Sequence, residues 1–241
     1  MPTLTIFYPA FNEESYIKRA VEAAREVGDC MLENNEVSDY EILIVNDAST
    51  DRTSEILEAI SEDDKRIRCI HHEKNRGLGG ALKSGFKHAN GNLVLYSDID
   101  LPFDMMELRK AYRLMRYYEA DIVTAFRFDR ICEGIRRLIY SRVYNATVML
   151  LFGLRVKDVN FAFKLIKKEV LNKVELKSEG SFIDAELLTK SNQLGFHIIQ
   201  FGTNYFHRSR GISTLSNLST IFNILREMAI LYKEIKYYKT V

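Results

Sequence analysis

The chain has 241 residues, 46% of them hydrophobic, and its 34 lysines and arginines nearly balance 33 aspartates and glutamates. A chain of this length and apolar content can bury a continuous core, which excludes an intrinsically disordered protein. The near-neutral charge gives no overall field that would favour nucleic acid as a partner.

Three further observations bear on cellular location. Cys30, Cys69 and Cys132 lie far apart without Cys-x-x-Cys spacing, which disfavours disulfides or structural zinc and indicates a reducing cytoplasm. No basic segment followed by a long apolar run opens the chain, so we expect no secretory signal. The longest nearly apolar run, residues 146–154, is about half of what a membrane-spanning helix needs. We expect a cytoplasmic protein that does not cross a membrane but could lie on one.

Strand-like and helical patterns alternate along the first half of the chain. Strands are predicted at residues 3–8, 41–46, 67–71, 92–97 and 122–125. Helices are predicted at residues 13–28, 51–63, 79–89 and 104–118, with Gly28 as the stop signal of the first. This alternation is typical of βαβ units and predicts a mostly parallel sheet flanked by helices.

The second half of the chain is less regular. We predict a helix at 133–152, a short segment at 158–167, a helix at 181–194, a strand at 197–205 and a helix at about 217–238. Residues 1–215 are expected to form one α/β domain on a single sheet, and residues 216–241 a C-terminal amphipathic helix.

Ligands of such sheets bind at the carboxyl ends of the strands. The loops that start at Pro9, Asn46, His72 and Ser97 should therefore share one crevice.

Two carboxylates, Asp98 and Asp100, follow the strand at 92–97 on one turn. A bend would let both reach a hard divalent cation that also binds diphosphate oxygens. The alternative is a cluster of capping residues ahead of the helix at 104–118.

Turn-forming polar residues follow the first three strands as well. Residues 9–14 read Pro-Ala-Phe-Asn-Glu-Glu and residues 46–51 read Asn-Asp-Ala-Ser-Thr-Asp. Asx turns or helix caps would explain each loop by itself. They do not readily explain why such loops occur together at the ends of successive strands. The glycines of residues 75–81, Asn-Arg-Gly-Leu-Gly-Gly-Ala, allow either a close ligand approach or tight packing of a helix start.

In this order and spacing, the three loops and Asp98-Ile-Asp100 resemble family 2 glycosyltransferases, which have the GT-A fold, a Rossmann-like α/β architecture. The second half resembles the polyprenyl-phosphate (dolichol-phosphate) sugar synthase branch, so that the resemblance covers about residues 3–215. The matching pieces there are Phe126-Arg127, Arg137 with Ser141, residues 158–164, Glu186-Leu-Leu and residues 208–213.

The resemblance assigns roles to residues on the donor side. Pro9, Phe11 and Glu13 would line the nucleobase pocket, and Asp47 would contact the base or ribose. Asp98 and Asp100 would hold Mg²⁺ or Mn²⁺ and the diphosphate, since a diphosphate among carboxylates needs a cation. Arg76 would contact a phosphate or the loop. Pro102 stands where the family often has glutamine. The cation is therefore expected to have fewer protein ligands or to use Asp104 as an additional one.

Acceptor-side roles follow in the same way. Arg127, Arg137 and Arg208 would bind phosphates, because guanidinium grips phosphate with two hydrogen bonds, and Ser141 would add a hydroxyl. A carboxylate near Asp184 or Glu186 deprotonates the acceptor in relatives that glycosylate sugar hydroxyls. A phosphate acceptor needs no strong base, which would leave Glu186 to orient the acceptor-side loops.

Basic residues outnumber acids nine to two over residues 130–168 and six to two over residues 205–241. The C-terminal helix has an apolar stripe at three- and four-residue steps, made of Leu218, Ile221, Phe222, Leu225, Met228, Ala229, Tyr232 and Ile235. This stripe would either rest on an anionic membrane surface or pack on its own domain or a dimer partner. A lipid-linked acceptor requires the first arrangement, on the cytoplasmic face.

The sequence therefore predicts an inverting hexosyltransferase that uses GDP-mannose or UDP-glucose and a polyprenyl or dolichyl phosphate acceptor. One alternative keeps the fold but uses a sugar-hydroxyl acceptor in glycan or polysaccharide synthesis. A nucleotidyltransferase is disfavoured because no Gly-x-Gly-x-Arg signature occurs in the Pro9 loop. A non-catalytic sugar-nucleotide or membrane-binding module is disfavoured by the intact Asp98 and Asp100.

Overall fold

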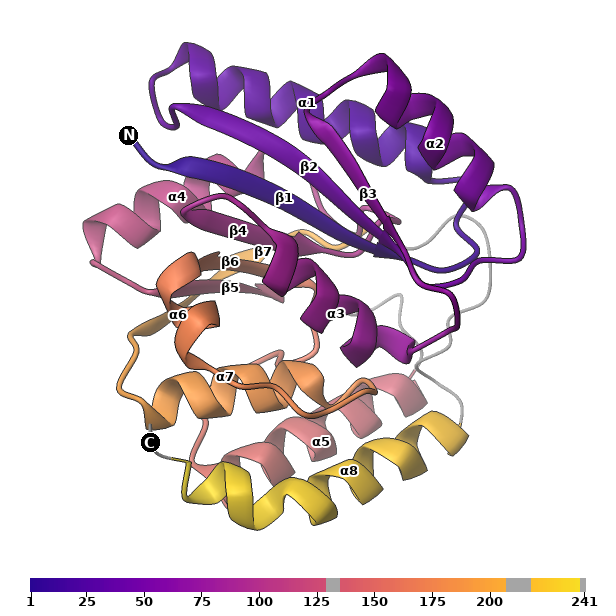
Figure 1. The fold of residues 1–241 in the computed structure, drawn as a ribbon. Helices are drawn as coiled ribbons and strands as arrows, with labels where there is room; N and C mark the ends of the chain where they lie inside the picture. The colour runs from indigo at the N-terminus through magenta and orange to yellow at the C-terminus, as the bar shows by residue number, and fades with distance from the viewer. Residues whose placement is uncertain (129–134, 207–217, 239–241) are drawn as a thin grey trace.

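The computed structural model describes residues 1–128, 135–206 and 218–238 (Figure 1). The described residues contain a seven-stranded sheet with the strand order β3-β2-β1-β4-β6-β5-β7. Its strands are β1 Thr3–Ala10, β2 Asp39–Asn46, β3 Ile67–His71, β4 Leu93–Ser97, β5 Ile122–Arg127, β6 Phe163–Lys167 and β7 Ile198–Thr203. The helices are α1 Ile17–Glu33, α2 Thr53–Asp63, α3 Gly77–His88, α4 Glu107–Tyr117, α5 Ile135–Phe152, α6 Lys168–Lys173, α7 Ile183–Gln193 and α8 Leu218–Lys236.

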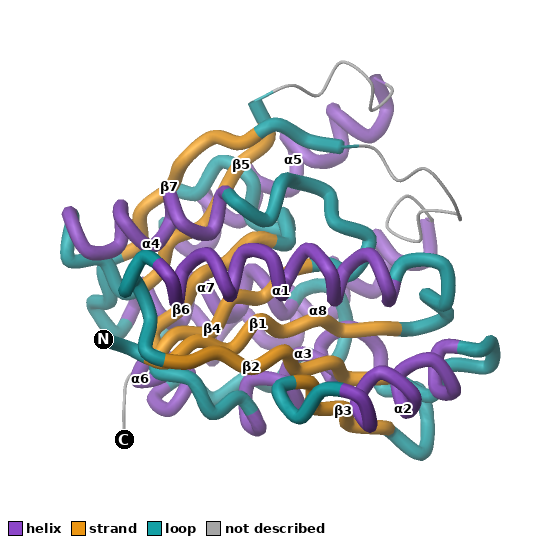
Figure 2. The backbone as a smooth tube through the Cα atoms, turned by 90° about the horizontal axis from the view of Figure 1, so that it is seen from above, coloured by secondary structure: helices purple, strands orange, loops and turns teal. Residues whose placement is uncertain are grey.

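Successive residues of the central strands face opposite sides of the sheet and are buried on both. In β1, Ile6 and Tyr8 belong to the core beneath α1, α2 and α4, whereas Phe7 belongs to the core beneath α3, α6 and α7. The helices α5 and α8 pack side by side as a further layer beyond α7 (Figure 1). From above, the strands spread from β3 at one edge to β7 at the other beneath α1 (Figure 2).

One strand runs against the others. β6 pairs antiparallel with both β4 and β5, so that Phe163 lies opposite Ser97. The beginning of β6 and the loop before it therefore lie at the carboxyl end of β4. The sequence predicted a short segment at 158–167 but not this reversed direction.

The predicted stop of the first helix at Gly28 is wrong, since α1 continues to Glu33. A Cβ atom at Gly28 would lie 2.7 Å from the ring of Tyr40 on β2. Glycine is therefore used here for close packing of α1 on the sheet rather than for ending the helix. None of the described helices is long and apolar enough to span a bilayer.

Candidate active site at the carboxyl edge of the sheet

The loops after β1 and β2 are bonded to each other. The backbone N–H of Asn12 donates to Ser49 Oγ at 2.9 Å, and Thr50 N–H donates to Asn12 Oδ1 at 2.8 Å. Glu13 N–H donates to Thr53 Oγ1 at 2.9 Å, at the start of α2. Asn12 has a φ of 56°, a region in which asparagine is less disfavoured than most residues. The two polar loops thus form one rim at the carboxyl edge of the sheet. This agrees with the prediction that loops after neighbouring strands lie together.

The residues predicted to line a nucleobase pocket lie along this rim. Pro9 pairs with Val45 near the end of β1, and Phe11 just beyond it exposes 46% of its surface. Glu13 is half-buried, and its negative charge acts on Asp98. An exposed aromatic ring at this edge offers a stacking surface for a base, and the contact itself remains a prediction.

Asp47 fixes the turn between β3 and α3. Its carboxylate accepts the backbone N–H of Arg76 at 2.8 and 3.1 Å, and His72 Nδ1 lies 2.6 Å from its Oδ1. A carboxylate only accepts hydrogen bonds, so His72 carries its proton on Nδ1. His72 Nε2 in turn lies 2.8 Å from Ser84 Oγ on α3. Asp47 therefore positions the turn, and a contact of Asp47 with base or ribose remains a prediction.

Asp98 and Asp100 leave β4 on a bend that buries the intervening Ile99 to 2% exposure and leaves both aspartates partly exposed, with Asp100 Oδ1 buried. The bend closes through Leu101, which has a φ of 53°. Burial, reinforced by the charges of Asp100 and Asp184, raises the pKa of Asp98 to about 8. A bound cation would reverse this, because it favours the ionised carboxylates.

The donor chemistry of this bend fits a divalent cation. Among the described residues, no three histidine, cysteine, aspartate or glutamate side chains form a metal-holding group. Two carboxylates would thus supply part of the coordination, with diphosphate oxygens and water for the rest. Pro102 is buried and its carbonyl accepts Phe206 N–H at 2.8 Å. Asp104 is exposed and accepts Met106 N–H at 2.9 Å in the turn before α4. No side chain among those described caps the first turn of α4, so the capping alternative for the acidic cluster gains no support there.

Two charged groups that the sequence did not place beside this bend, Lys164 and Asp184, lie next to it. Lys164 of β6 is fully buried, with Nζ 2.7 Å from Asp184 Oδ1 and donating to Phe161 O at 2.9 Å. Burial raises the pKa of Asp184 even though Lys164 opposes this. Lys164 also counteracts the shift at Asp98. It is therefore the internal countercharge of the acidic cluster.

Arg127 is engaged by a carboxylate. Its Nε and Nη2 lie 2.7 and 2.9 Å from the two oxygens of Asp158, and its guanidinium lies over the rings of Phe161 and Tyr205 at 5.5 and 5.2 Å. The Nε–Nη2 edge of the guanidinium thus holds the loop before β6. Phosphate binding by Arg127 stays a prediction, and binding through this edge would require the ion pair with Asp158 to open.

The sequence comparison decides the family. Residues 5–175 match the family described as Glycosyl transferase family 2. The chain belongs to glycosyl transferase family 2. Glycosyltransferase AglD of Haloferax volcanii is 29% identical over 207 residues, which are 84% of this chain and 33% of AglD. Dolichyl-phosphate beta-glucosyltransferase ALG5A of Trichomonas vaginalis is 24% identical over 241 residues, covering 95% of this chain and 74% of that protein. The chain thus spans about a third of AglD and most of ALG5A.

Solved structures confirm the predicted GT-A fold. Glucosyl-3-phosphoglycerate synthase of Mycobacterium tuberculosis, in complex with Mn²⁺ and UDP-glucose, superposes with a TM-score of 0.68 at 20% identity. The match covers 98% of this chain and 79% of the synthase. A second complex of that enzyme, which also contains phosphoglyceric acid, gives a TM-score of 0.69. The likeness concerns the fold.

In this family 2 chain, Glu186 does not face the acidic bend. Its carboxylate is fully buried and accepts the backbone N–H groups of Lys177 and Ser178 at 2.8–3.1 Å. Lys190 Nζ also donates to it at 2.7 Å. These bonds favour the other role considered, the orientation of a loop, over a direct catalytic role, and the role of Glu186 in the reaction stays a prediction.

The remaining acceptor-side residues are only partly described. Ser141 lies on α5, and its Oγ accepts a 3.4 Å hydrogen bond from Asn145, whose Oδ1 accepts Val159 N–H at 3.1 Å. Ser141 thus borders the same loop that Arg127 holds. Arg137 lies in the first turn of α5, but its side chain is outside the described part of the chain, as is all of Arg208.

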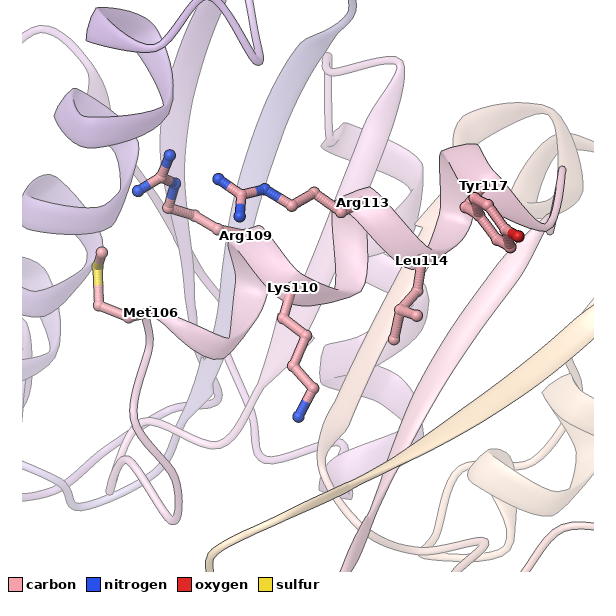
Figure 3. Close-up of a pocket in the computed structure, with 6 residues that line it drawn as sticks. All are labelled: Met106, Arg109, Lys110, Arg113, Leu114 and Tyr117. Atoms are coloured by element: carbon pink, nitrogen blue, oxygen red, sulfur yellow. The ribbon is translucent and has the colours of Figure 1, made fainter.

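A surface hollow elsewhere lies on the outer side of α4 (Figure 3). It is lined by Met106, Arg109, Lys110, Arg113, Leu114 and Tyr117. Arg109 and Arg113 both bond to Glu36 at about 3 Å, so their charges already have a partner. The hollow contributes no carboxylate that could bind a cation.

Proposed function

We propose that this protein is an inverting hexosyltransferase that moves a sugar from a nucleotide diphosphate donor to a polyprenyl or dolichyl phosphate. The observation that carries the proposal is the position of Asp98 and Asp100 beside the bonded rim of the β1 and β2 loops. The similarity to ALG5A, named for dolichyl phosphate, supports the acceptor class. UDP-glucose and GDP-mannose are the donors to be tested.

In the proposed reaction, an acceptor phosphate oxygen forms a bond to the anomeric carbon while the bond to the donor diphosphate breaks. The nucleoside diphosphate leaves with the electron pair, and the configuration at the anomeric carbon inverts. Bound Mg²⁺ or Mn²⁺ would neutralise the charge on the leaving diphosphate. Asp98 and Asp100 would hold the cation, Asp47 would keep the donor-side turn in place, and Arg137, Arg208 and Ser141 would bind the acceptor phosphate.

A polyprenyl chain stays in the bilayer, so this acceptor requires an enzyme at the membrane surface. The outer faces of α5 and α8 expose Leu150 at 84%, Phe222 at 67% and Ile230 at 67%. The two acids of α8, Glu227 and Glu234, bond toward the protein interior, while Arg226 and Lys233 are exposed. An apolar surface with basic residues suits an anionic leaflet, and we propose peripheral attachment on the cytoplasmic face.

A second candidate reaction uses a sugar or other hydroxyl acceptor. Asp184 favours it, because its carboxylate lies in the acidic cluster and its pKa is raised by burial, which makes the group a stronger base. The structural neighbour named for phosphoglycerate glucosylation is consistent with this option.

One experiment separates these reactions. The purified chain is incubated with Mn²⁺, radiolabelled UDP-glucose or GDP-mannose, and polyprenyl phosphate in vesicles. Label should move into the lipid extract and be released as sugar by mild acid. Label that appears only on added soluble sugars or phosphoglycerate would reject the lipid acceptor and support the second candidate. A preparation of Asp100→Ala serves as the blank.

A further inference from the structure

The segment of residues 177–180, between α6 and α7, is held by two carboxylates from two helices. Glu186 of α7 accepts the backbone N–H groups of its first two residues at 2.8–3.1 Å. Glu227 of α8 accepts those of its last two residues at 3.2 and 3.0 Å, together with the Ser178 hydroxyl at 2.8 Å. Four consecutive backbone donors are thus bonded to ionisable side chains instead of to secondary structure.

The other side of the 177–180 segment packs on the first turn of α3. Gly79 N–H donates to Glu179 O at 2.9 Å, which satisfies a donor that a helix start leaves without an intrahelical partner. A Cβ atom on Gly79 would lie 2.5 Å from Ser178 O, and one on Gly77 would lie 2.8 Å from Glu179 O. The glycines at the start of α3 therefore allow this segment to approach, which favours the tight-packing explanation of the glycine-rich motif.

The same first turn of α3 carries the donor-side contacts. Arg76, immediately before α3, donates its backbone N–H to Asp47, and Gly77 follows at a φ of 70°. Lys83 of α3 also pairs with the Glu179 carboxylate. Hydrogen bonds consequently lead from Glu227 of α8 through the 177–180 segment to Gly79, and the backbone of the first turn of α3 leads from there to Arg76 and the turn that Asp47 fixes.

We propose that Glu227 is a positioning residue through which α8 holds the 177–180 segment against α3 and so sets the donor-side turn at Arg76 and Asp47. The proposal deepens the proposed function and rests on it for the identity of the donor site. It gives α8 a task in the reaction besides any contact with a membrane. Movement of α8 would alter the affinity for the donor rather than the rate of the chemical step.

The first test is hydrogen exchange by mass spectrometry, which needs no substrate. In Glu227→Ala, peptides that cover residues 75–82 and 177–182 should exchange at least about threefold faster than in the unmodified chain, because loss of bonds to a charged group frees the segment. Peptides of β1 and β2 should be unchanged. Glu227→Gln should stay near the unmodified rates, since its amide oxygen can accept the two N–H groups and its NH₂ can donate to Ser178 Oγ.

The matched control is Glu234→Ala on the same helix. Glu234 bonds only to the side chains of Lys177 and Lys190 among its described partners, at 2.9 Å. Its loss should leave the exchange of residues 75–82 unaltered. Unchanged exchange at 75–82 in Glu227→Ala, or equal acceleration in Glu234→Ala, would overturn the proposal. Should Glu227→Ala fail to fold, Ser178→Ala removes one contact of the same carboxylate and should show the smaller change at the same peptides.

The second test is kinetic and uses whichever of UDP-glucose and GDP-mannose supports transfer. Glu227→Ala should raise the donor KM about fivefold, as expected when part of the energy of its three lost hydrogen bonds reaches the donor-side turn, with kcat and acceptor KM nearly unchanged. An equal fall in kcat with unaltered donor KM would contradict the proposal. If neither donor supports transfer, the proposed reaction fails, and the exchange experiment still decides the coupling.

Discussion

Three carboxyl groups, Asp98, Asp100 and Asp184, lie within one another's electrostatic reach, with Lys164 as the partner that offsets them. The sequence predicted the first two, because they directly follow a strand of recognisable pattern. It could not predict Lys164 or Asp184 at this point, since both depend on the reversed direction of β6 and on the packing of α7. The sequence did name Asp184 as a possible base and residues 158–164 as a matching segment, but it contained no information that brings either beside Asp98.

The repulsion within this cluster leads to a prediction at the scale of single residues. Asp98→Asn should raise the melting temperature in EDTA at pH 7 by at least about 2 °C, because a carboxyl whose pKa is raised in the folded state costs stability above its ordinary pKa and an amide has no such cost. Mn²⁺ should stabilise the unmodified chain but not this variant, which should also lose transferase activity. Differential scanning fluorimetry with and without Mn²⁺ measures both effects. Equal stabilisation of the two proteins by Mn²⁺ would show that the cation binds elsewhere.

At the scale of elements, the alternation of patterns correctly predicted most strands and helices of the first half. Gly28 was misread, because a glycine near the end of a helical pattern usually indicates a stop, whereas here it allows contact with Tyr40. The hydroxyl of Tyr40 is bonded to Asp29 at 2.6 Å and accepts from Arg66 at 2.6 Å, so its ring has little freedom to retreat. Sequence periodicity contains no information about such a distance between a helix and a strand.

Gly28→Ala should therefore destabilise the protein by about 1–3 kcal/mol, despite the gain in helix propensity of about 1 kcal/mol. The measurement is urea unfolding followed by circular dichroism. Glu26→Ala, an exposed substitution on the same helix, should change the free energy of unfolding by less than about 0.5 kcal/mol. A Gly28→Ala protein as stable as the original would mean that α1 can shift away from the sheet without cost.

Glu41 of β2 joins several elements through hydrogen bonds. Burial pushes its pKa up, but the backbone N–H of Asn90, Arg68 and Thr5 more than offset this, so the pKa lies below its ordinary value of 4.5. A carboxyl with a lowered folded-state pKa contributes stability above its ordinary pKa and loses it as the pH falls through the folded-state value.

Glu41→Gln should thus destabilise the protein at pH 7. The difference from the unmodified chain should shrink as the pH is lowered below 4.5, in urea unfolding measured across that range. A difference that stays constant with pH would assign the effect to packing instead.

At the scale of the whole molecule, the prediction of one apolar stripe on the C-terminal helix was incomplete. Met228 and Ile235 of that stripe are buried against the protein, whereas Phe222 and Leu225 are exposed. Packing on the protein's own domain therefore applies to the buried residues of α8, whereas a membrane or dimer contact of the exposed residues stays a prediction. Periodicity could not separate the buried from the exposed residues, because the width of an apolar stripe does not say how much of it a neighbouring helix covers.

The exposed part leads to a prediction about membranes. At low salt the protein should co-sediment with vesicles that contain anionic lipid, and binding should weaken as salt is added. Phe222→Asp combined with Leu225→Asp should reduce binding at least about tenfold without lowering the melting temperature, because both side chains are exposed. Tyr117→Asp, on the exposed surface of α4, is the control and should bind as the original does. An unmodified chain that ignores anionic vesicles but forms dimers in analytical ultracentrifugation would assign this surface to a second copy.

The reversed strand β6 also has a consequence for the order of assembly during synthesis. The four strands β3, β2, β1 and β4 can pair as soon as residue 97 has left the ribosome, since each parallel partner is already present. β5 emerges next but has no place beside β4, and the two become joined only when residues 163–167 insert between them. Until then the nascent chain carries an open edge on β4, a surface to which other strands can add. Chains that end shortly before residue 163 should consequently be prone to aggregation although more than half of the sheet could already form.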